Sequence, residues 1–94
     1  MNLSENQKNI ILNVLRPYHP VSVGIFGSYA RGEETENSDL DLLVDFEKAY
    51  NLFILMDIEE SLFNQLGIKI DLITVGSLNT HVKPFILKDL KLIN

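Results

Sequence analysis

Two short polar segments of this sequence carry side chains suited to phosphate and metal chemistry. Residues 29–38 separate the pair Gly27-Ser28 from the segment Asp39-Leu40-Asp41. Side chains alternate faces along a strand, so the two aspartates point the same way while Leu40 points into the sheet. Adjacent carboxylates repel each other unless a cation lies between them, and Mg²⁺ binds a few carboxylates together with substrate phosphate oxygens.

The Gly27-Ser28 pair supplies a complementary group for a phosphate. A glycine lets a ligand approach the backbone closely, and exposed backbone N–H groups together with a serine hydroxyl can donate to phosphate oxygens. A phosphate-binding turn beside paired carboxylates indicates a site for nucleotidyl transfer.

Asp71 is the third candidate carboxylate. Residues 68–74 alternate as a half-buried strand does, with Lys69 and Asp71 on the face opposite Ile68, Ile70 and Leu72. Strands are depleted in aspartate, so one at mid-strand needs a reason. It is either a solvated carboxylate on an edge strand or a third member of the site, and the motif upstream favours the second interpretation.

The composite pattern Gly27-Ser28-Tyr29-Ala30-Arg31-Gly32 … Ser38-Asp39-Leu40-Asp41-Leu42-Leu43-Val44 resembles the signature of the polymerase-beta-like nucleotidyltransferase superfamily. It is most similar to the smallest branch, the minimal nucleotidyltransferase (MNT) domain, and the resemblance covers nearly the whole chain. It implies an α/β (α+β) nucleotidyltransferase fold, in which helices flank a small mixed β-sheet.

The resemblance also implies roles for individual residues. Asp39 and Asp41 would hold two Mg²⁺ ions, with Mn²⁺ as an alternative, and Asp71 would lie beside the ion that activates the incoming hydroxyl. Gly27 and Ser28 would contact the phosphates of ATP, the expected substrate.

The sequence leaves two interpretations for each of three basic side chains. Arg31 either steadies the phosphates or a partner carboxylate, or forms a structural salt bridge with the glutamates nearby. His81 and Lys83 either face a partner or a triphosphate, or are solvated loop residues.

MNT domains of this size resemble the antitoxin halves of two-gene toxin–antitoxin pairs, whose partner is a HEPN-domain ribonuclease toxin. The resemblance implies an enzyme that transfers AMP from ATP to a tyrosine hydroxyl of that toxin within a hetero-oligomeric complex, which neutralises the toxin. Two alternatives stay open. One is a catalytically weak, nucleotide-binding antitoxin that neutralises the toxin by binding, and the other is transfer to a small-molecule hydroxyl.

Composition narrows the class of protein further. A net charge of −5 argues against direct nucleic-acid binding, which needs a basic face. The chain has no cysteine, which excludes disulfides and thiolate metal sites. It has no signal-peptide pattern and no apolar run of the roughly 20 residues that span a bilayer. We therefore expect one cytoplasmic domain over residues 1–94, without a membrane partner.

Hydrophobic periodicity and turn residues predict the elements that position the site. Ser4 and Gln7 form a capping box for a helix ending near Leu15, and Asn51 caps a longer helix. The apolar row of the longer helix, which includes Met56 and Phe63, is expected to pack in the core. The expected elements are helix 5–15, strand 21–26, a helical turn 29–31, strand 39–46, helix 52–66, strand 68–74, a short helix from 84 to about 87, and strand 91–93.

Overall fold

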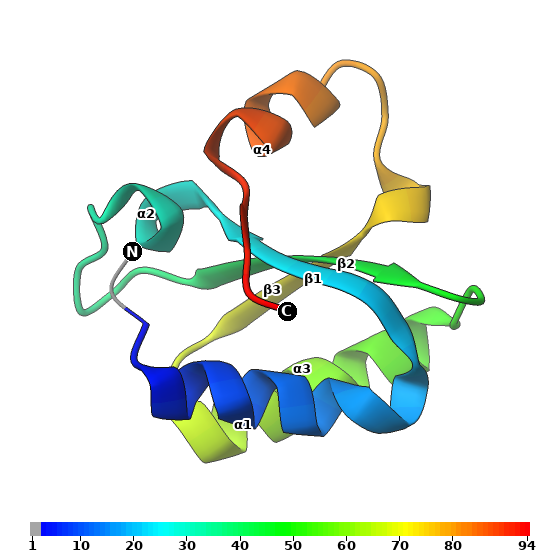
Figure 1. Cartoon of the computed structure of the whole chain (residues 1–94), viewed down its shortest axis with the longest axis horizontal. Helices are drawn as coiled ribbons and strands as arrows, with labels where there is room; N and C mark the ends of the chain where they lie inside the picture. Colours follow the sequence, from blue (N-terminus) through cyan, green and yellow to red (C-terminus); the bar gives the residue numbers. More distant parts are fainter. Residues whose placement is uncertain (1–2) are drawn as a thin grey trace.

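The computed structural model describes residues 3–94 (Figure 1). Met1 and Asn2, where the expected domain begins, lie outside the described residues. The elements are α1 (Glu5–Leu15), β1 (Pro20–Phe26), α2 (Gly27–Arg31), β2 (Leu40–Phe46), α3 (Leu52–Leu66), β3 (Ile70–Thr74), α4 (Lys83–Asp89) and β4 (Lys91–Leu92), with 3₁₀ turns at Arg16–Tyr18 and Val75–Ser77.

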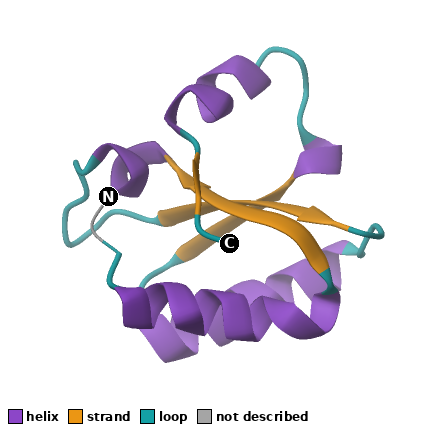
Figure 2. Cartoon of the chain, in the orientation of Figure 1, coloured by secondary structure: helices purple, strands orange, loops and turns teal. Residues whose placement is uncertain are grey.

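The four strands form one mixed sheet in the order β3-β2-β1-β4. β1 runs antiparallel to both of its neighbours, β2 and β4, whereas β2 and β3 run parallel. The parallel pair requires a crossover connection, and α3 supplies it. The expected class, a small mixed sheet flanked by helices, is therefore confirmed (Figure 2).

Helices cover the two faces of the sheet unequally. The long helices α1 and α3 lie side by side on one face, and the short helices α2 and α4 lie on the other (Figure 1). The main core lies between the sheet and the long pair. Its most fully buried side chains are Ile11, Leu15, Val23, Ile25, Leu40, Leu42, Val44, Ile58 and Leu62.

Local hydrogen bonds begin and end the long helices where the sequence predicts. The Ser4 side chain accepts from the Gln7 N–H while the Gln7 side chain accepts from the Ser4 N–H, a complete capping box. Asn51 Oδ1 accepts from Ile54 N at 3.0 Å at the start of α3. Gly67 ends α3 at φ 72°, a left-handed conformation that glycine adopts without steric cost.

Four strand boundaries differ from the expectation, two of them by a single residue at the start of β1, Pro20, and the end of β4, Leu92. β2 begins at Leu40, so Asp39 lies one residue ahead of the strand, and β3 begins at Ile70 instead of residue 68. The later starts of β2 and β3 coincide, because both strands begin where they first pair with each other. At that point the Leu40 N–H donates to Lys69 O at 2.8 Å. α4 also continues to Asp89, beyond the predicted end near residue 87.

The expectation that the apolar row of α3 packs in the core is wrong in part. Only Ile58 and Leu62 of this helix are buried. Leu52, Met56 and Phe63 are exposed. A helix resting on one sheet face and one neighbouring helix buries a single stripe, and α3 is apolar around more of its circumference than that stripe.

No helix among residues 3–94 is both long and apolar enough to cross a membrane.

Candidate functional site

Strand pairing brings Asp41 and Asp71 together although thirty positions of sequence numbering lie between them. In the parallel ladder of β2 and β3, Asp41 is the register partner of Asp71. Leu40 and Leu42, on either side of Asp41, are fully buried in the core beneath the sheet. Alternation therefore turns the Asp41 side chain to the opposite face, the one that carries α2 and α4.

The turn from β1 into α2 brings Gly27 against this carboxylate. Phe26 pairs with Asp41 across the antiparallel ladder, and Gly27 follows it with φ 71°. A Cβ atom at Gly27 would collide with Asp41 Oδ2. Glycine is thus needed here for two reasons, the left-handed backbone and the close approach of the carboxylate.

The electrostatics of Asp41 show that both other predicted carboxylates act on it. Partial burial, then the like charges of Asp71 and Asp39, raise the pKa of Asp41 from 3.8 to about 6, while the positive charge of Arg31 lowers it. Burial and repulsion both disfavour the charged form, so a nearby cation would relieve both.

The three side chains do not form a preorganised metal cage. Asp39 is half-buried ahead of β2, and Asp71 is exposed on the edge strand β3. Within residues 3–94, no three His, Cys, Asp or Glu side chains are arranged closely enough to hold a metal ion.

The donor set nevertheless fits Mg²⁺. This ion is commonly held by one or two carboxylates together with substrate phosphates and water, so it does not need an all-protein cage. Asp39, Asp41 and Asp71 supply only oxygen donors, and such an ion would offset both the burial and the like charges that raise the pKa of Asp41.

Arg31 forms a salt bridge with a nearby glutamate, Glu33, as one of its two interpretations predicted, but its shorter bridge is to Asp89, which is distant in sequence and was not predicted. Arg31 Nη1 donates to Asp89 Oδ2 at 2.7 Å, and Nε donates to Glu33 Oε2 at 3.5 Å. The hydrogen bond to Asp89 is the main reason that the pKa of Arg31 is raised. The bridge ties α2 to the end of α4, and nothing in the local sequence signals it. A role toward phosphate stays a prediction.

His81 and Lys83 lie at the start of α4, where both side chains are exposed. Asn79 Oδ1 accepts from the backbone N–H groups of His81 and Val82, which orders the chain ahead of the helix. Glu59 of α3 is a supporting residue that sequence reasoning missed. It accepts from Leu72 N at 2.9 Å and so satisfies a backbone group of β3 next to Asp71.

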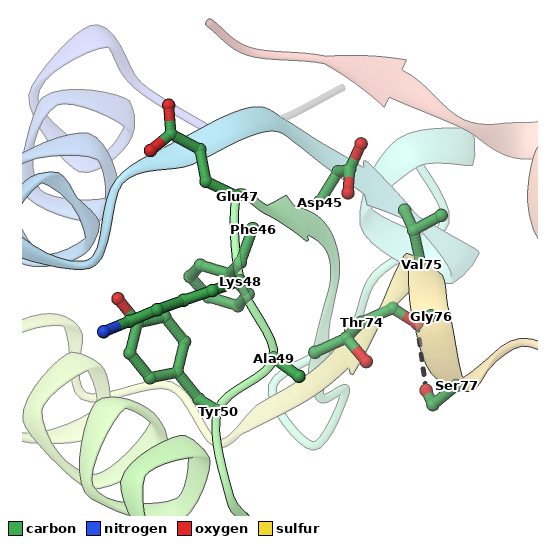
Figure 3. Close-up of a pocket in the computed structure, with 10 residues that line it drawn as sticks. All are labelled: Asp45, Phe46, Glu47, Lys48, Ala49, Tyr50, Thr74, Val75, Gly76 and Ser77. Atoms are coloured by element: carbon green, nitrogen blue, oxygen red, sulfur yellow. Dashed lines mark hydrogen bonds between the residues drawn. The ribbon is translucent and has the colours of Figure 1, made fainter.

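A hollow of about 390 Å³ lies at the other end of the sheet (Figure 3). Its lining comes from the end of β2 and the residues after it, and from the end of β3 with its 3₁₀ turn. Ser77 Oγ donates to Thr74 O at 2.9 Å within this wall (Figure 3). None of the three predicted carboxylates lines the hollow, so we place the candidate site at Asp41 and Asp71 instead.

Comparison with known families and relatives agrees with the fold. The family described as "Nucleotidyltransferase domain" matches residues 8–93. MJ0126 of Methanocaldococcus jannaschii, provisionally named a protein adenylyltransferase, is 47% identical over 74 residues, which are 78% of this chain and 76% of that protein. Protein adenylyltransferase MntA of Thermococcus cleftensis is 42% identical over 67 residues, covering 71% of this chain and 68% of that protein.

Solved structures share the fold. A toxin–antitoxin structure with AMP-PNP superposes with a TM-score of 0.85 at 24% identity, covering 93% of this chain and 72% of that chain. A complex of tri-AMPylated Shewanella oneidensis HEPN toxin with MNT antitoxin gives a TM-score of 0.80 at 19% identity, covering 98% and 72%. With the family match over residues 8–93 and the two relatives, the chain belongs to the nucleotidyltransferase domain family.

Proposed function

We propose that this protein is a protein adenylyltransferase that acts as an antitoxin. It transfers AMP from ATP to a tyrosine hydroxyl of a partner HEPN-domain toxin and thereby neutralises it. The observation that carries the proposal is the pairing of Asp41 with Asp71 on the open face of the sheet, directly against Gly27. The names of the adenylyltransferase relatives support the reaction, and the MNT–HEPN complex supports the partner.

Asp39 and Asp41 are the residues proposed to hold two Mg²⁺ ions, with Mn²⁺ as the alternative, and Asp71 completes the site where the acceptor hydroxyl approaches. Bound there, the ions would stabilise negative charge on the attacking and leaving oxygens of the α-phosphoryl group. In the transfer, a bond forms between the tyrosine oxygen and the α-phosphorus, the bond to the diphosphate leaving group breaks, and the proton of the tyrosine hydroxyl is released to solvent.

The turn at Gly27 and Ser28 is the proposed contact for the remaining phosphates. The absence of a side chain at Gly27 leaves its backbone accessible, and Ser28 contributes a hydroxyl and an N–H. Arg31 keeps further donors available while bound to Asp89, because a guanidinium carries five N–H groups. It can therefore contact a phosphate without giving up the bridge between α2 and α4.

The assembly that follows is a hetero-oligomer with the toxin, with ATP as the second substrate and with no direct contact to nucleic acid. The net charge of −5 is the wrong sign for a phosphate backbone, whereas bound cations would make the local site compatible with a nucleotide. The proposed compartment is the cytoplasm, where ATP is available.

Neutralisation by binding alone is the second candidate function. Asp71 is exposed on an edge strand, and the three carboxylates among the described residues do not converge as a ready-made metal site. A protein that only occludes its partner would tolerate such an arrangement.

Mass spectrometry of the co-expressed toxin separates the two functions. An enzyme should modify toxin present in excess over it, adding about 329 Da for each AMP, and the modification should persist after separation. The variant Asp39→Asn/Asp41→Asn/Asp71→Asn, checked for folding by circular dichroism, should lose the mass shift. Equal protection of cells by this variant and the wild type, with unmodified toxin in both, would contradict the enzyme.

A further inference from the structure

The outer surface of α3 carries four exposed apolar side chains, with Glu59 and Glu60 between the first three of them and Phe63 along the helix. Leu52, Phe53, Met56 and Phe63 are 66%, 77%, 51% and 49% exposed. Positions 52, 56 and 63 fall in one row along the helix, and Phe53 lies beside the row. Single exposed apolar residues are ordinary, whereas several on one helix face mark an interaction surface.

Acidic side chains border this patch. Asp57 and Glu60 are exposed on the same helix, next to Phe53 and Met56. The whole segment of α3, LFILMDIEESLFNQL, contains no lysine or arginine. The patch therefore combines an apolar row with a negatively charged border.

We infer that the outer surface of α3 docks an amphipathic helix of a partner protein, whose apolar row is flanked by lysine or arginine. Helix-on-helix docking through apolar anchors at i, i+4 and i+11 matches the spacing of the exposed row. Basic flanks on the partner complement the border formed by Asp57 and Glu60.

A second copy of this chain is a poor occupant. A symmetric dimer would place the same patch on both sides of the interface, so Asp57 and Glu60 of each copy would face the acids of the other. Like charges brought together across an interface oppose association, and the net charge of −5 on each chain adds to this repulsion. A partner of opposite charge avoids both penalties.

The proposed docking surface on α3 and the candidate site at Asp41 lie on opposite faces of the sheet. α3 covers one face of the sheet, whereas Asp41 points to the face that carries α2 and α4 (Figure 1). A partner held on α3 leaves the carboxylates open to ATP and to an acceptor hydroxyl. Substitutions in the patch should therefore change partner binding without changing nucleotide binding.

The test uses the full-length, ¹⁵N-labelled protein and two synthetic helical peptides about 18 residues long, a length at which contact can sustain a helix. The peptides share one leucine row and differ only in flanking residues, lysine in one and glutamate in the other. We expect the lysine peptide to shift backbone amide signals of α3, and the glutamate peptide to leave them in place.

Two phenylalanines provide a matched pair of variants. Phe53 is 77% exposed on α3, and Phe85 is 76% exposed on α4, on the other side of the sheet. Phe53→Ala should weaken binding of the lysine peptide about tenfold, as loss of an aromatic anchor does. Phe85→Ala should leave the affinity within about twofold, as is usual for a residue outside an interface.

Charge reversal tests the border independently of the apolar row. Asp57→Lys/Glu60→Lys should exchange the preference, so that the glutamate peptide binds and the lysine peptide does not. Both positions are exposed, so the fold should survive, and unchanged amide signals of the core would show this.

Three outcomes would overturn the inference. Lysine-peptide shifts confined to Asp39, Asp41 and Asp71 would show simple attraction to the acidic site. Equal weakening by Phe53→Ala and Phe85→Ala would show non-specific binding. Shifts of α3 that grow with protein concentration in the absence of peptide, and that Phe53→Ala removes, would identify a second copy as the occupant. No arm of the experiment uses ATP, so a failure of the proposed adenylyl transfer would leave its result unaffected.

Discussion

The two faces of the sheet differ in what the side chains of one strand, β2, do on each of them. On β2, Leu40, Leu42 and Val44 face α1 and α3 and are fully buried, while Asp41 faces the other way beside Gly27. The first face excludes water and stabilises the fold. The second holds Asp41 partly buried and near Asp71 and Asp39, and this burial and these like charges raise the pKa of Asp41. The fully buried side chains and the candidate chemistry are thus placed on alternate residues of β2, although Leu43 on the face of Asp41 is also buried, and substitutions should separate stability from chemistry.

The largest expected effect is a loss of stability on substitution of a β2 side chain that packs against α1 and α3. Leu42→Ala should lower the free energy of unfolding by about 2–5 kcal/mol, because it removes a fully buried side chain and leaves a cavity. Urea denaturation measures this loss. Leu52→Ala, on the exposed side of α3, is the matched control and should cost less than about 0.5 kcal/mol. Comparable losses at the two positions would show that the burial of these faces has been misassigned.

The next effect belongs to the carboxylate face. Asp71→Asn should slow AMP transfer by at least about 10²-fold, since a proposed metal-ligand group is lost from the acceptor side. ATP affinity should change much less, because Asp39 and Asp41 remain. Single-turnover transfer and calorimetric ATP binding provide the two readings. Transfer at the wild-type rate would make Asp71 a solvated edge-strand carboxylate.

Gly27→Ala should lower both the stability of the fold and the affinity for ATP. Each effect should be smaller than the two effects above. A left-handed backbone costs a non-glycine residue about 1–2 kcal/mol, and the new Cβ would displace the Asp41 carboxylate. We expect a lower melting temperature together with weaker ATP binding. Gly67→Ala serves as the control, because Gly67 has a similar φ of 72° but open space around it. It should lose a similar amount of stability and keep ATP binding.

The smallest expected effect is on the pH dependence of stability. The pKa of Asp41 is about 6 in the folded protein, above its ordinary 3.8, so the folded state holds the proton more tightly than the unfolded state. This group therefore stabilises the metal-free fold below about pH 4, and the contribution is lost as the pH rises through about 6. The whole contribution is at most about 1 kcal/mol, because the side chain is only partly buried and solvent screens it.

Asp41→Asn should remove this dependence. The variant should melt above the wild type at pH 7 without metal, and the difference should vanish near pH 4. Asp57→Asn, on the exposed surface of α3, controls for the loss of one negative charge. A constant difference between Asp41→Asn and wild type across this range would show that folding does not raise the pKa of Asp41.

Local interactions explain which parts of the fold the sequence predicts well. The Ser4 capping box, the Asn51 cap and the left-handed Gly67 each depend on groups within a few residues, so their sequence signals survive into the structure. Strand ends are less predictable from local pattern. The start of β2 at Leu40 is set by pairing with a distant segment, through the bond from its N–H to Lys69 O.

By itself, the sequence determined which groups the candidate site can offer: a glycine-serine turn, an Asp-x-Asp segment and a third aspartate within a predicted strand. Only the tertiary structure decided that Asp71 is the register partner of Asp41, and that Arg31 joins Asp89 across 58 positions. Only it decided that the apolar row of α3 is half exposed. Residue type and spacing specify what a side chain can do, whereas its neighbours and its burial depend on which distant segments fold against it.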